Sequence, residues 1–166
     1  NALKLSFQIT GRKAFGSFQG GWHGRTFLAL AVTDDPKITE AFESIFPEHH
    51  QFPFGDVQAL ESIDFSNLAC VIVEPIQSMS GIRTASSEWF SALRAKCTKA
   101  GCFLIFDEIQ TGVGRMGQPF ASHYFKVRPD FITSAKGLAS GVPIGALMMT
   151  EAVAQHVKSH MLGSTF

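Results

Sequence analysis

Two residues of complementary chemistry, Lys136 and Asp107, each follow an apolar run of the sequence. Lys136 lies within residues 134–137 (SAKG), whose small side chains would let a flat molecule approach the backbone. A lysine held where water is scarce loses its charge more readily, and the neutral amine can form a Schiff base with an aldehyde. Taken alone, however, Lys136 is better explained as a surface lysine in a loop.

Asp107 ends the apolar run 102–106, where a carboxylate is costly to bury unless something pairs with it. One interpretation of Asp107 is a helix cap or a structural ion pair. The other is a carboxylate that keeps a pyridine nitrogen protonated, so that the ring can accept electrons. Asp107 and Lys136 are weak signals individually, but together they suggest a functional pair.

The elements that must position these residues alternate between helices and short apolar strands. The spacing predicts a first helix that ends at Gly11 and a later one between the N-cap Ser86 and Gly101. Further helices are expected over 25–32 and 151–158, and residues 34–68 are expected to be connections with one short helix. Strands are expected over 13–18, 70–74, 102–106, 131–133 and 146–149.

Continuous apolar runs separated by helices are typical of an α/β fold, with a parallel sheet covered on both faces. In such sheets ligands bind beyond the carboxyl ends of the strands. Three of the runs deliver a charged residue at or just after that end, namely Glu74, Asp107 and Lys136. We therefore expect a site at this edge of the sheet.

Composition limits the classes of function. The chain has 166 residues, enough for one domain, and is 45% hydrophobic and 17% charged, which suits a folded core. Fourteen basic and 14 acidic residues balance to a formal charge of +0, so no basic surface for nucleic acid is expected. No apolar run approaches the ~20 residues that span a bilayer, and the first residues do not resemble a secretory signal.

Three cysteines, Cys70, Cys97 and Cys102, form no C-x-x-C pair. Cys70 and Cys102 each begin an apolar run, where a free thiol behaves as a small hydrophobic side chain. A catalytic cysteine is not favoured, because none has a neighbouring histidine or helix start to lower its pKa. Reduced thiols indicate a cytoplasmic protein, and no metal site is expected.

Four blocks of the sequence resemble the class III aminotransferases of the ornithine, acetylornithine and ω-amino acid type, which use pyridoxal 5′-phosphate (PLP). They occur in one order along the whole chain. The blocks are GWHGRT (21–26), VEPIQ (73–77), LIFDEIQTG (104–112) with Gly114 and Arg115, and SAKG (134–137) with Gly145 and Ala146, and the final GSTF (163–166) fits as well.

The resemblance implies catalytic roles for two residues. Lys136 would carry PLP as a Schiff base and, once freed, move a proton between the substrate carbon and the cofactor C4′. Asp107 would pair with the pyridine nitrogen, and Gln110 would hydrogen-bond the 3′ oxygen. Trp22 and Ile109 would lie against opposite faces of the ring.

Other matching positions complete the implied cofactor-binding set. His23, Gly24 and Glu74 are included, although His23 alone is better explained as structural and Glu74 is open between a site residue and a strand-end cap. Thr165 would reach the cofactor phosphate of a neighbouring subunit, which implies a homodimer. Arg115 is open between a structural and an interface residue.

The family also implies a fold and a place for this chain within it. The fold would be the fold type I large domain, a three-layer structure with a parallel-rich sheet, and residues 1–166 would be its central part. The phosphate-binding turn would precede Asn1, and a C-terminal small domain would follow. Many members have Gly-Glu where this chain has Ser78 and Met79, which leaves ornithine-type specificity open.

The expected reaction moves an amino group from an amino acid or ω-amine to a 2-oxo acid such as 2-oxoglutarate. Acetylornithine, ornithine, lysine and other ω-amines all remain as donors. Alternatives are an aminomutase or decarboxylase on the same scaffold, or a non-catalytic α/β module that binds a nucleotide or partner protein. Against that module, no G-x-x-x-x-G-K-[ST] pattern occurs. We also expect the isolated 166-residue chain to be inactive and not to retain PLP.

Overall fold

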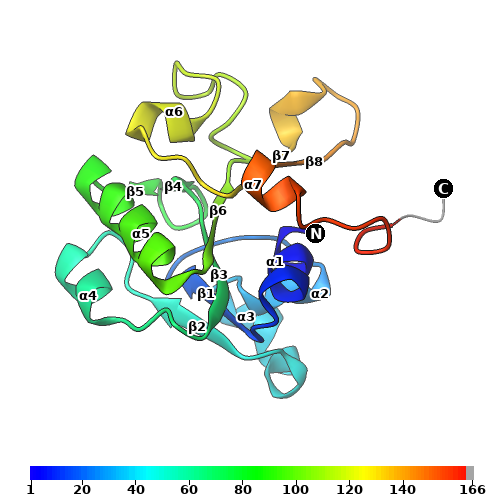
Figure 1. The fold of residues 1–166 in the computed structure, drawn as a ribbon. Helices are drawn as coiled ribbons and strands as arrows, with labels where there is room; N and C mark the ends of the chain where they lie inside the picture. Colours follow the sequence, from blue (N-terminus) through cyan, green and yellow to red (C-terminus); the bar gives the residue numbers. More distant parts are fainter. Residues whose placement is uncertain (164–166) are drawn as a thin grey trace.

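A computed structural model describes residues 1–163 as a six-stranded sheet with helices against both faces (Figure 1). The strand order is β2-β1-β3-β6-β7-β8, and β4 and β5 form a separate hairpin. In chain order the elements are α1 (Ala2–Thr10), β1 (Ala14–Phe18), α2 (Phe27–Ala31), α3 (Pro36–Thr39), the 3₁₀ helix η1 (Glu40–Ile45), β2 (His49–Phe52), α4 (Val57–Ser62), β3 (Leu68–Val73), β4 (Ile76–Gln77), β5 (Arg83–Thr84), α5 (Ser87–Ala100), β6 (Phe103–Asp107), α6 (Ala121–Phe125), β7 (Phe131–Ser134), the 3₁₀ helix η2 (Lys136–Leu138), β8 (Ala146–Met149) and α7 (Glu151–Ala154).

The sheet is parallel except at one edge. Neighbouring strands from β2 to β7 run parallel, whereas β8 runs antiparallel to β7, with Ser134 opposite Ala146. The expectation of a parallel-rich sheet is therefore confirmed, with β8 as its one antiparallel strand. Parallel strands need a crossover of a dozen or more residues, usually through a helix. Between β7 and β8 the chain has only the short η2, so it turns back beside β7.

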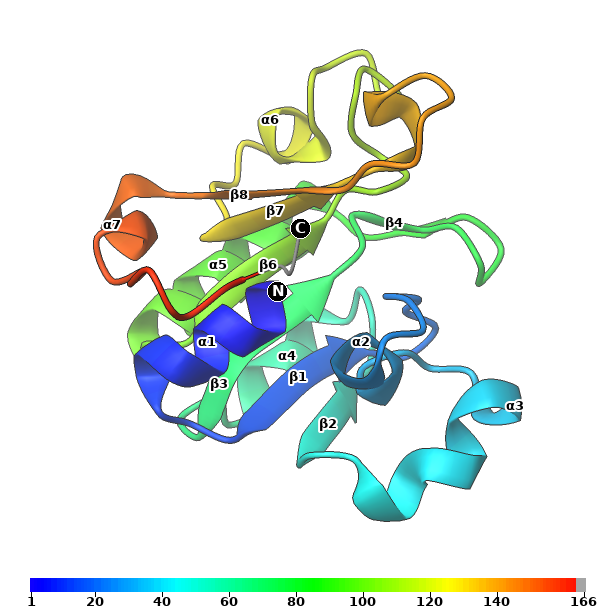
Figure 2. The same cartoon turned by 90° about the vertical axis from the view of Figure 1, so that its right-hand side faces the viewer.

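Alternating side chains of the strands pack into two apolar clusters, one on each face. On one face Val71, Leu104 and Phe106 pack with Trp89 and Phe90 of α5. On the other face the cluster contains residues of α1, β1, β3, β6, β7 and α7, among them Leu5, Phe15, Ile72, Ile105, Phe131 and Val153. Figure 2 shows α1 in front of β1 and β3, and α4 and α5 behind them. The three-layer α/β expectation is confirmed.

Helix α5 confirms its expected boundaries. The Ser86 hydroxyl accepts a hydrogen bond from the Trp89 amide, which satisfies one of the free amides of the first turn. Gly101 ends the helix in the left-handed conformation with φ +63°, which suits a residue without a Cβ. Gly11 ends α1 in the same way.

Two expectations about elements are wrong. Residues 34–68 hold α3, η1, β2 and α4 rather than one short helix. Strand β2 gave no sequence signal because it pairs with β1 alone and its residues, such as His49 and His50, are polar. The helix expected over 151–158 ends at Ala154, and only Val153 of it is buried. Strand, helix and turn positions elsewhere agree within a few residues.

Within residues 1–163, no helix is long and apolar enough to cross a membrane.

Candidate active site

The three charged residues expected at one edge of the sheet do lie there. Glu74 follows the end of β3, Asp107 is the last residue of β6, and Lys136 comes two residues after the end of β7. Strands β3, β6 and β7 are neighbours and parallel, so their carboxyl ends lie together. The expected gathering of these three residues at one edge of the sheet is therefore confirmed, while their roles stay a prediction.

Asp107 is buried and has a partner for each carboxylate oxygen. Its Oδ2 lies 2.9 Å from Nδ1 of His23, which is also buried. Its Oδ1 accepts hydrogen bonds from the Thr133 hydroxyl at 3.2 Å and from the Ile109 amide at 3.3 Å. The carboxylate is thus held in one orientation by three groups from three segments of the chain.

His23 is fixed to the core by a second contact. Its backbone amide donates to the Thr33 hydroxyl at 2.9 Å, and Thr33 in turn donates to the Ala29 carbonyl. With Nδ1 against Asp107, the other ring nitrogen, Nε2, is buried and has no hydrogen-bond partner among residues 1–163. An unpaired polar atom in such a place is costly, and it marks a point where a ligand could add a contact.

Glu74 holds the backbone of the same loop. Its Oε1 accepts a hydrogen bond of 2.7 Å from the Trp22 amide, and its side chain is buried. Burial raises the pKa of the Glu74 carboxyl above its ordinary value, although the hydrogen bond from Trp22 opposes the shift. Glu74 and Asp107 together attach the loop 20–24 to the ends of β3 and β6.

Trp22 is half-buried beside this acid pair. The guanidinium carbon of Arg25 lies 5.6 Å from the centre of its indole ring, a cation–π contact. Gly24 adopts φ +123°, a conformation that L side chains rarely take, so glycine is required for the loop to turn there. The sequence did not predict the contact with Arg25.

Lys136, Ile109 and Gln110 line one cavity of about 480 Å³. Its other walls come from the β4–β5 hairpin and from the segment after Thr111, including Ile76, Ser78, Ile82, Val113, Arg115 and Met116. The sequence-predicted residues therefore form two groups. One is the buried hydrogen-bond network around Asp107, and the other lines this cavity. The Ile109 amide, bonded to Asp107, connects the two.

The environment of Lys136 differs from the expectation. The residue is exposed, and within the described part of the chain no hydrogen bond or ion pair reaches its amine. Its φ of +47° is left-handed, which is uncommon for a non-glycine residue and occurs often at functional sites. Within residues 1–163 the amine is therefore open to solvent, unlike the water-poor setting expected for it.

Glu108 is a structural residue of the site that sequence reasoning missed. It is fully buried and accepts hydrogen bonds from the Thr111 hydroxyl and from the amides of Ala121 and Ser122, the first two residues of α6. It therefore closes the segment between β6 and α6, which carries Ile109 and Gln110. The available signal in the sequence was a second acid directly after Asp107. In the structure the two acids bind different partners, so each has its own role.

A second glycine pattern, which sequence reasoning missed, bears on the alternative of a nucleotide-binding module. Residues 112–117 (GVGRMG) spell G-x-G-x-x-G. A dinucleotide site needs this pattern directly after a strand and at the opening of a helix. Here the segment is a series of turns that begins five residues after β6 and ends before α6. The pattern therefore does not have the geometry of a dinucleotide site.

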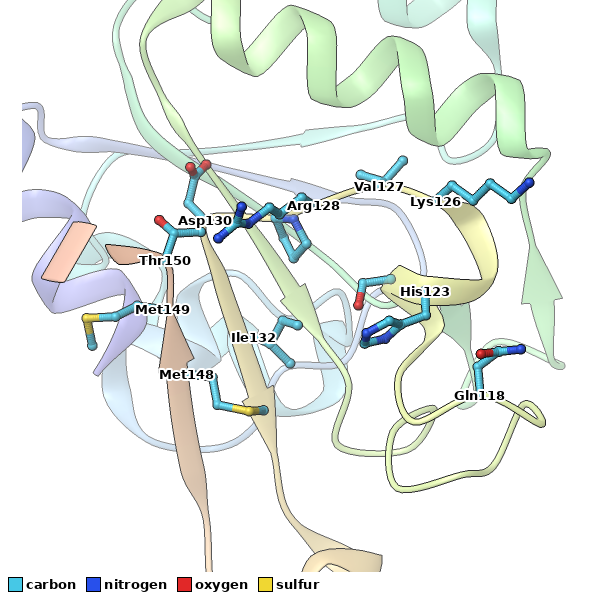
Figure 3. A pocket seen from close by; sticks show the side chains of 12 residues that line it. Gln118, His123, Lys126, Val127, Arg128, Asp130, Ile132, Met148, Met149 and Thr150 are labelled. Carbon is cyan, nitrogen blue, oxygen red and sulfur yellow. The ribbon is translucent and has the colours of Figure 1, made fainter. Parts of the chain in front are cut away.

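A larger cavity, of about 670 Å³, lies elsewhere (Figure 3). It runs along β7 and β8, with Asp130 and Thr150 at one end and Gln118 and Lys126 at the other. None of the sequence-predicted site residues that the structure describes lines it. Thr165 lies outside the described residues, so its predicted role has no structural counterpart here.

The residues at the sheet edge fit a pyridine ring that carries an aldehyde. A buried carboxylate can hold a protonated ring nitrogen, and an exposed amine beside a cavity can bond the aldehyde. His23 Nε2 and the Ser134 hydroxyl, both buried and without partners in residues 1–163, are available for further polar contacts. The chemical groups at this edge are therefore the kinds that PLP requires. Among residues 1–163 no direct contact joins Lys136 to Asp107.

Comparisons with known proteins identify the family of the chain. A family model described as "Aminotransferase class-III" matches residues 1–166. Acetylornithine aminotransferase of Methanopyrus kandleri is 44% identical over 165 residues, or 99% of this chain and 42% of that protein. The corresponding protein of Archaeoglobus fulgidus is 41% identical, over 99% of this chain and 44% of that protein.

A solved structure is similar as well. Ornithine aminotransferase of Toxoplasma gondii superposes with a TM-score of 0.86 at 29% identity, over 99% of this chain and 41% of that one. The fold is thus the one found in part of that protein. The chain spans well under half the length of the curated relatives that it matches.

Proposed function

Because the chain belongs to the class III aminotransferase family, we propose that the whole protein moves an amino group from an amino acid or ω-amine to a 2-oxo acid, with PLP on Lys136. The position of Asp107 and Lys136 at the carboxyl ends of the adjacent strands β6 and β7 supports this function most directly. These are the places where α/β sheets bind ligands. Residues 1–166 would form the centre of the PLP-binding domain.

When bound, PLP supplies a protonated ring that accepts electrons from the substrate carbon. Asp107 would keep the ring nitrogen protonated, because a buried carboxylate favours a positive charge beside it. His23 would act as a positioning residue, since its Nδ1 and the Thr133 hydroxyl hold the two Asp107 oxygens.

Lys136 would have two tasks. Its amine would bond the cofactor aldehyde before the donor arrives, and afterwards Nζ would accept the proton from the substrate carbon and return it to the new position. An amine must be neutral for both tasks. Lys136 is exposed in residues 1–163, so the substrate, the cofactor or further protein must exclude water from it.

The remaining residues would hold the ring. Ile109 lines the cavity beside Lys136 and would lie against one face, and Trp22 would cover the other. Gln110 would hydrogen-bond the 3′ oxygen, and Glu74 would keep the Trp22 backbone in place through its hydrogen bond. His23 and Gly24 would complete the loop beside the ring.

We extend the proposal to a homodimer in the cytoplasm. Thr165 would reach the cofactor phosphate of the partner subunit, on the strength of the family resemblance alone. The three free cysteines of the described chain support a reducing compartment. Light scattering of the purified protein at several concentrations would test the dimer, and a monomer that still transaminates would contradict it.

The test of the function is a substrate panel with the full-length protein and PLP. Acetylornithine, ornithine, lysine and other ω-amines are each supplied with 2-oxoglutarate, and glutamate and the new carbonyl product are measured by mass spectrometry. An aminotransferase yields both in equal amounts. An aminomutase yields an isomer without glutamate, and a decarboxylase yields carbon dioxide, so either result would replace the proposed reaction.

A further inference from the structure

Cys97 and Cys102 are brought together by the way α5 ends. The Cys102 amide donates to the Cys97 carbonyl at 3.1 Å, and the Gly101 amide donates to the Thr98 carbonyl at 3.2 Å. With Gly101 left-handed, these two bonds make a Schellman motif. The motif characteristically packs the side chain after the glycine against the side chain at the Cys97 position. The two thiols are therefore neighbours on one face of the sheet.

The surroundings make the two thiols chemically unequal. A hydrogen bond from the Cys97 thiol lowers the pKa of Cys102 despite burial, and the guanidinium groups of Arg12 and Arg94 lower it further. Burial raises the pKa of Cys97, and its role as donor to Cys102 adds to that effect. Arg94 lies one helical turn before Cys97 on α5, whereas Arg12 comes from the distant segment after α1. Cys102 is thus the thiol that ionises first and attacks first.

A small molecule has access to the pair. Both cysteines line a cavity of about 590 Å³, together with Arg94, Thr98 and Phe103. Arg128, Asp130 and Thr150 line this cavity as well as the larger one of Figure 3, so the two adjoin. The cysteines themselves are only 0% and 3% exposed, which limits attack to reagents small enough to enter.

We propose that Cys97 and Cys102 are a redox modification site, where a peroxide converts the two thiols into a reversible disulfide. The Cys102 thiolate attacks one peroxide oxygen, which leaves a sulfenic acid and releases the first water. The Cys97 sulfur then displaces the hydroxyl as a second water and closes the S–S bond. Two thiols are oxidised and one hydrogen peroxide is reduced to two waters, so atoms and electrons balance.

The geometry suits this bond. A disulfide requires α-carbons roughly 4.4–6.8 Å apart, and a backbone hydrogen bond joins these two residues directly. The bond would tie the end of α5 to the start of β6, the strand that carries Asp107 at its other end. The site is separate from the cavity at Lys136, since the two lie at opposite ends of the sheet strands.

Cys70 provides an internal control. It belongs to the apolar cluster on the opposite face of the sheet, whereas Cys97 and Cys102 belong to the α5 side. Burial raises the pKa of Cys70 to about 12. An ordinary thiol has a pKa of about 8.5, so the thiolate fraction of Cys70 is lower by about a thousandfold or more. We expect it to stay reduced.

The experiment treats the native full-length protein with hydrogen peroxide and then blocks free thiols with iodoacetamide under denaturing conditions. Trypsin cleaves between the two cysteines, so a disulfide joins peptide 97–99 to peptide 100–115, while Cys70 lies on peptide 38–83. Mass spectrometry should find the joined pair on most molecules, and dithiothreitol should reverse it. Cys70 should be alkylated, with oxidation at least about a hundredfold slower.

Variants make the assignment specific. Cys70→Ala should keep the link, whereas Cys97→Ala should abolish it and leave a Cys102 sulfenic acid that dimedone traps. A link that includes Cys70, irreversible oxidation of Cys102 in the native protein, or no reaction at the pair would each overturn the proposal. The native protein alone decides between these results, so a variant that fails to fold does not weaken the test.

Discussion

The imidazole of His23 and the carboxylate of Asp107 meet at 2.9 Å inside the protein, although 84 positions separate them in the sequence. His23 comes from a loop that follows β1, and Asp107 ends β6, two strands away in the sheet. A carboxylate buried without such a partner is destabilising. The pair thus lets the chain keep a charged group at the place where the proposed cofactor needs it.

His23→Ala should reduce the rate of the proposed reaction by roughly tenfold to a hundredfold, because a hydrogen bond to a charged group contributes ~1.5–3 kcal/mol. His23→Asn should restore part of the rate, since its side-chain amide can donate from nearly the position of Nδ1. The measurement is kcat and its pH profile for the full-length enzyme. Equal rates for the alanine variant and the wild type would leave His23 with a packing role only.

Asp107→Asn should be far more harmful than His23→Ala. The amide cannot stabilise a positive charge on the ring nitrogen, so the pKa of that nitrogen should fall by several units. Each unit corresponds to ~1.4 kcal/mol, and proton removal from the substrate should therefore slow by about a thousandfold or more. PLP should still be bound covalently. Asp56→Asn is the matched control, because asparagine also caps the helix that Asp56 begins. Near-normal turnover of Asp107→Asn would show that another group does this work.

Lys136 should be the residue that PLP labels. Borohydride reduction of the full-length holoenzyme should place a pyridoxyl group on the peptide that contains Lys136, with loss of the visible absorption band. Lys136→Arg should abolish the label, whereas Lys158→Arg, a change outside the proposed site, should not. A label on Lys4, Lys96 or Lys158 in the wild type would contradict the assignment.

The sequence predicted where the strands end, but not which side chains contact the residues at those ends. Glu74, Asp107 and Lys136 could be placed together because apolar runs locate strands, and parallel neighbours share one edge. The contact of His23 with Asp107 could not be predicted, because it depends on how a loop from β1 crosses that edge. Long-range contacts of this kind follow from the whole topology rather than from any local pattern.

The connections were less predictable for a different reason. Strand β2 is polar and lies at the edge of the sheet, so it lacks the apolar run that marks a central strand. Likewise, the apolar run of β8 would look the same in a parallel and in an antiparallel strand. The short connection from Ser134 to Ala146 is what makes β8 antiparallel to β7. The exposure of Lys136 could not be predicted, because hydrophobic periodicity shows which face of a helix or strand is buried. It does not show how exposed a residue in a connecting segment is.

Glu74 should make stability fall as pH rises. Burial raises its pKa in the folded chain, so the folded state binds its proton more tightly than the unfolded state does. Stability is then lost from the ordinary carboxyl pKa of about 4.3 upward through the raised value, and is fully present below that window. Glu74→Gln should therefore stabilise the protein more at pH 8 than at pH 4.

Urea unfolding across that pH range measures the effect. Glutamine can still accept the hydrogen bond from the Trp22 amide, so the loop should keep its position. Glu61→Gln, at an exposed position on α4, is the control and should show no comparable pH dependence. A Glu74→Gln variant that is more destabilised at pH 8 than at pH 4 would contradict this prediction and show that the fold needs the carboxylate in its charged form.

Glu108→Gln should destabilise the folded protein by about 2–5 kcal/mol and weaken PLP retention. The carboxylate accepts from the Thr111 hydroxyl at 3.1 Å, the Ala121 amide at 2.6 Å and the Ser122 amide at 2.9 Å. Glutamine keeps one acceptor oxygen, and its NH₂ group would face an amide donor. Each lost charge-assisted bond costs ~1.5–3 kcal/mol, and the buried donor remains unsatisfied.

The two effects of Glu108→Gln have one physical cause. The segment that Glu108 closes carries Ile109 and Gln110, and the Ile109 amide also donates to Asp107. Loosening this segment should therefore raise the dissociation constant for PLP by about tenfold or more while Asp107 itself is unchanged. Thermal unfolding and a PLP titration of the full-length protein measure the two quantities. Glu88→Gln, on the exposed first turn of α5, is the control. If Glu108→Gln lowers stability without changing PLP affinity, the segment between β6 and α6 does not hold the cofactor.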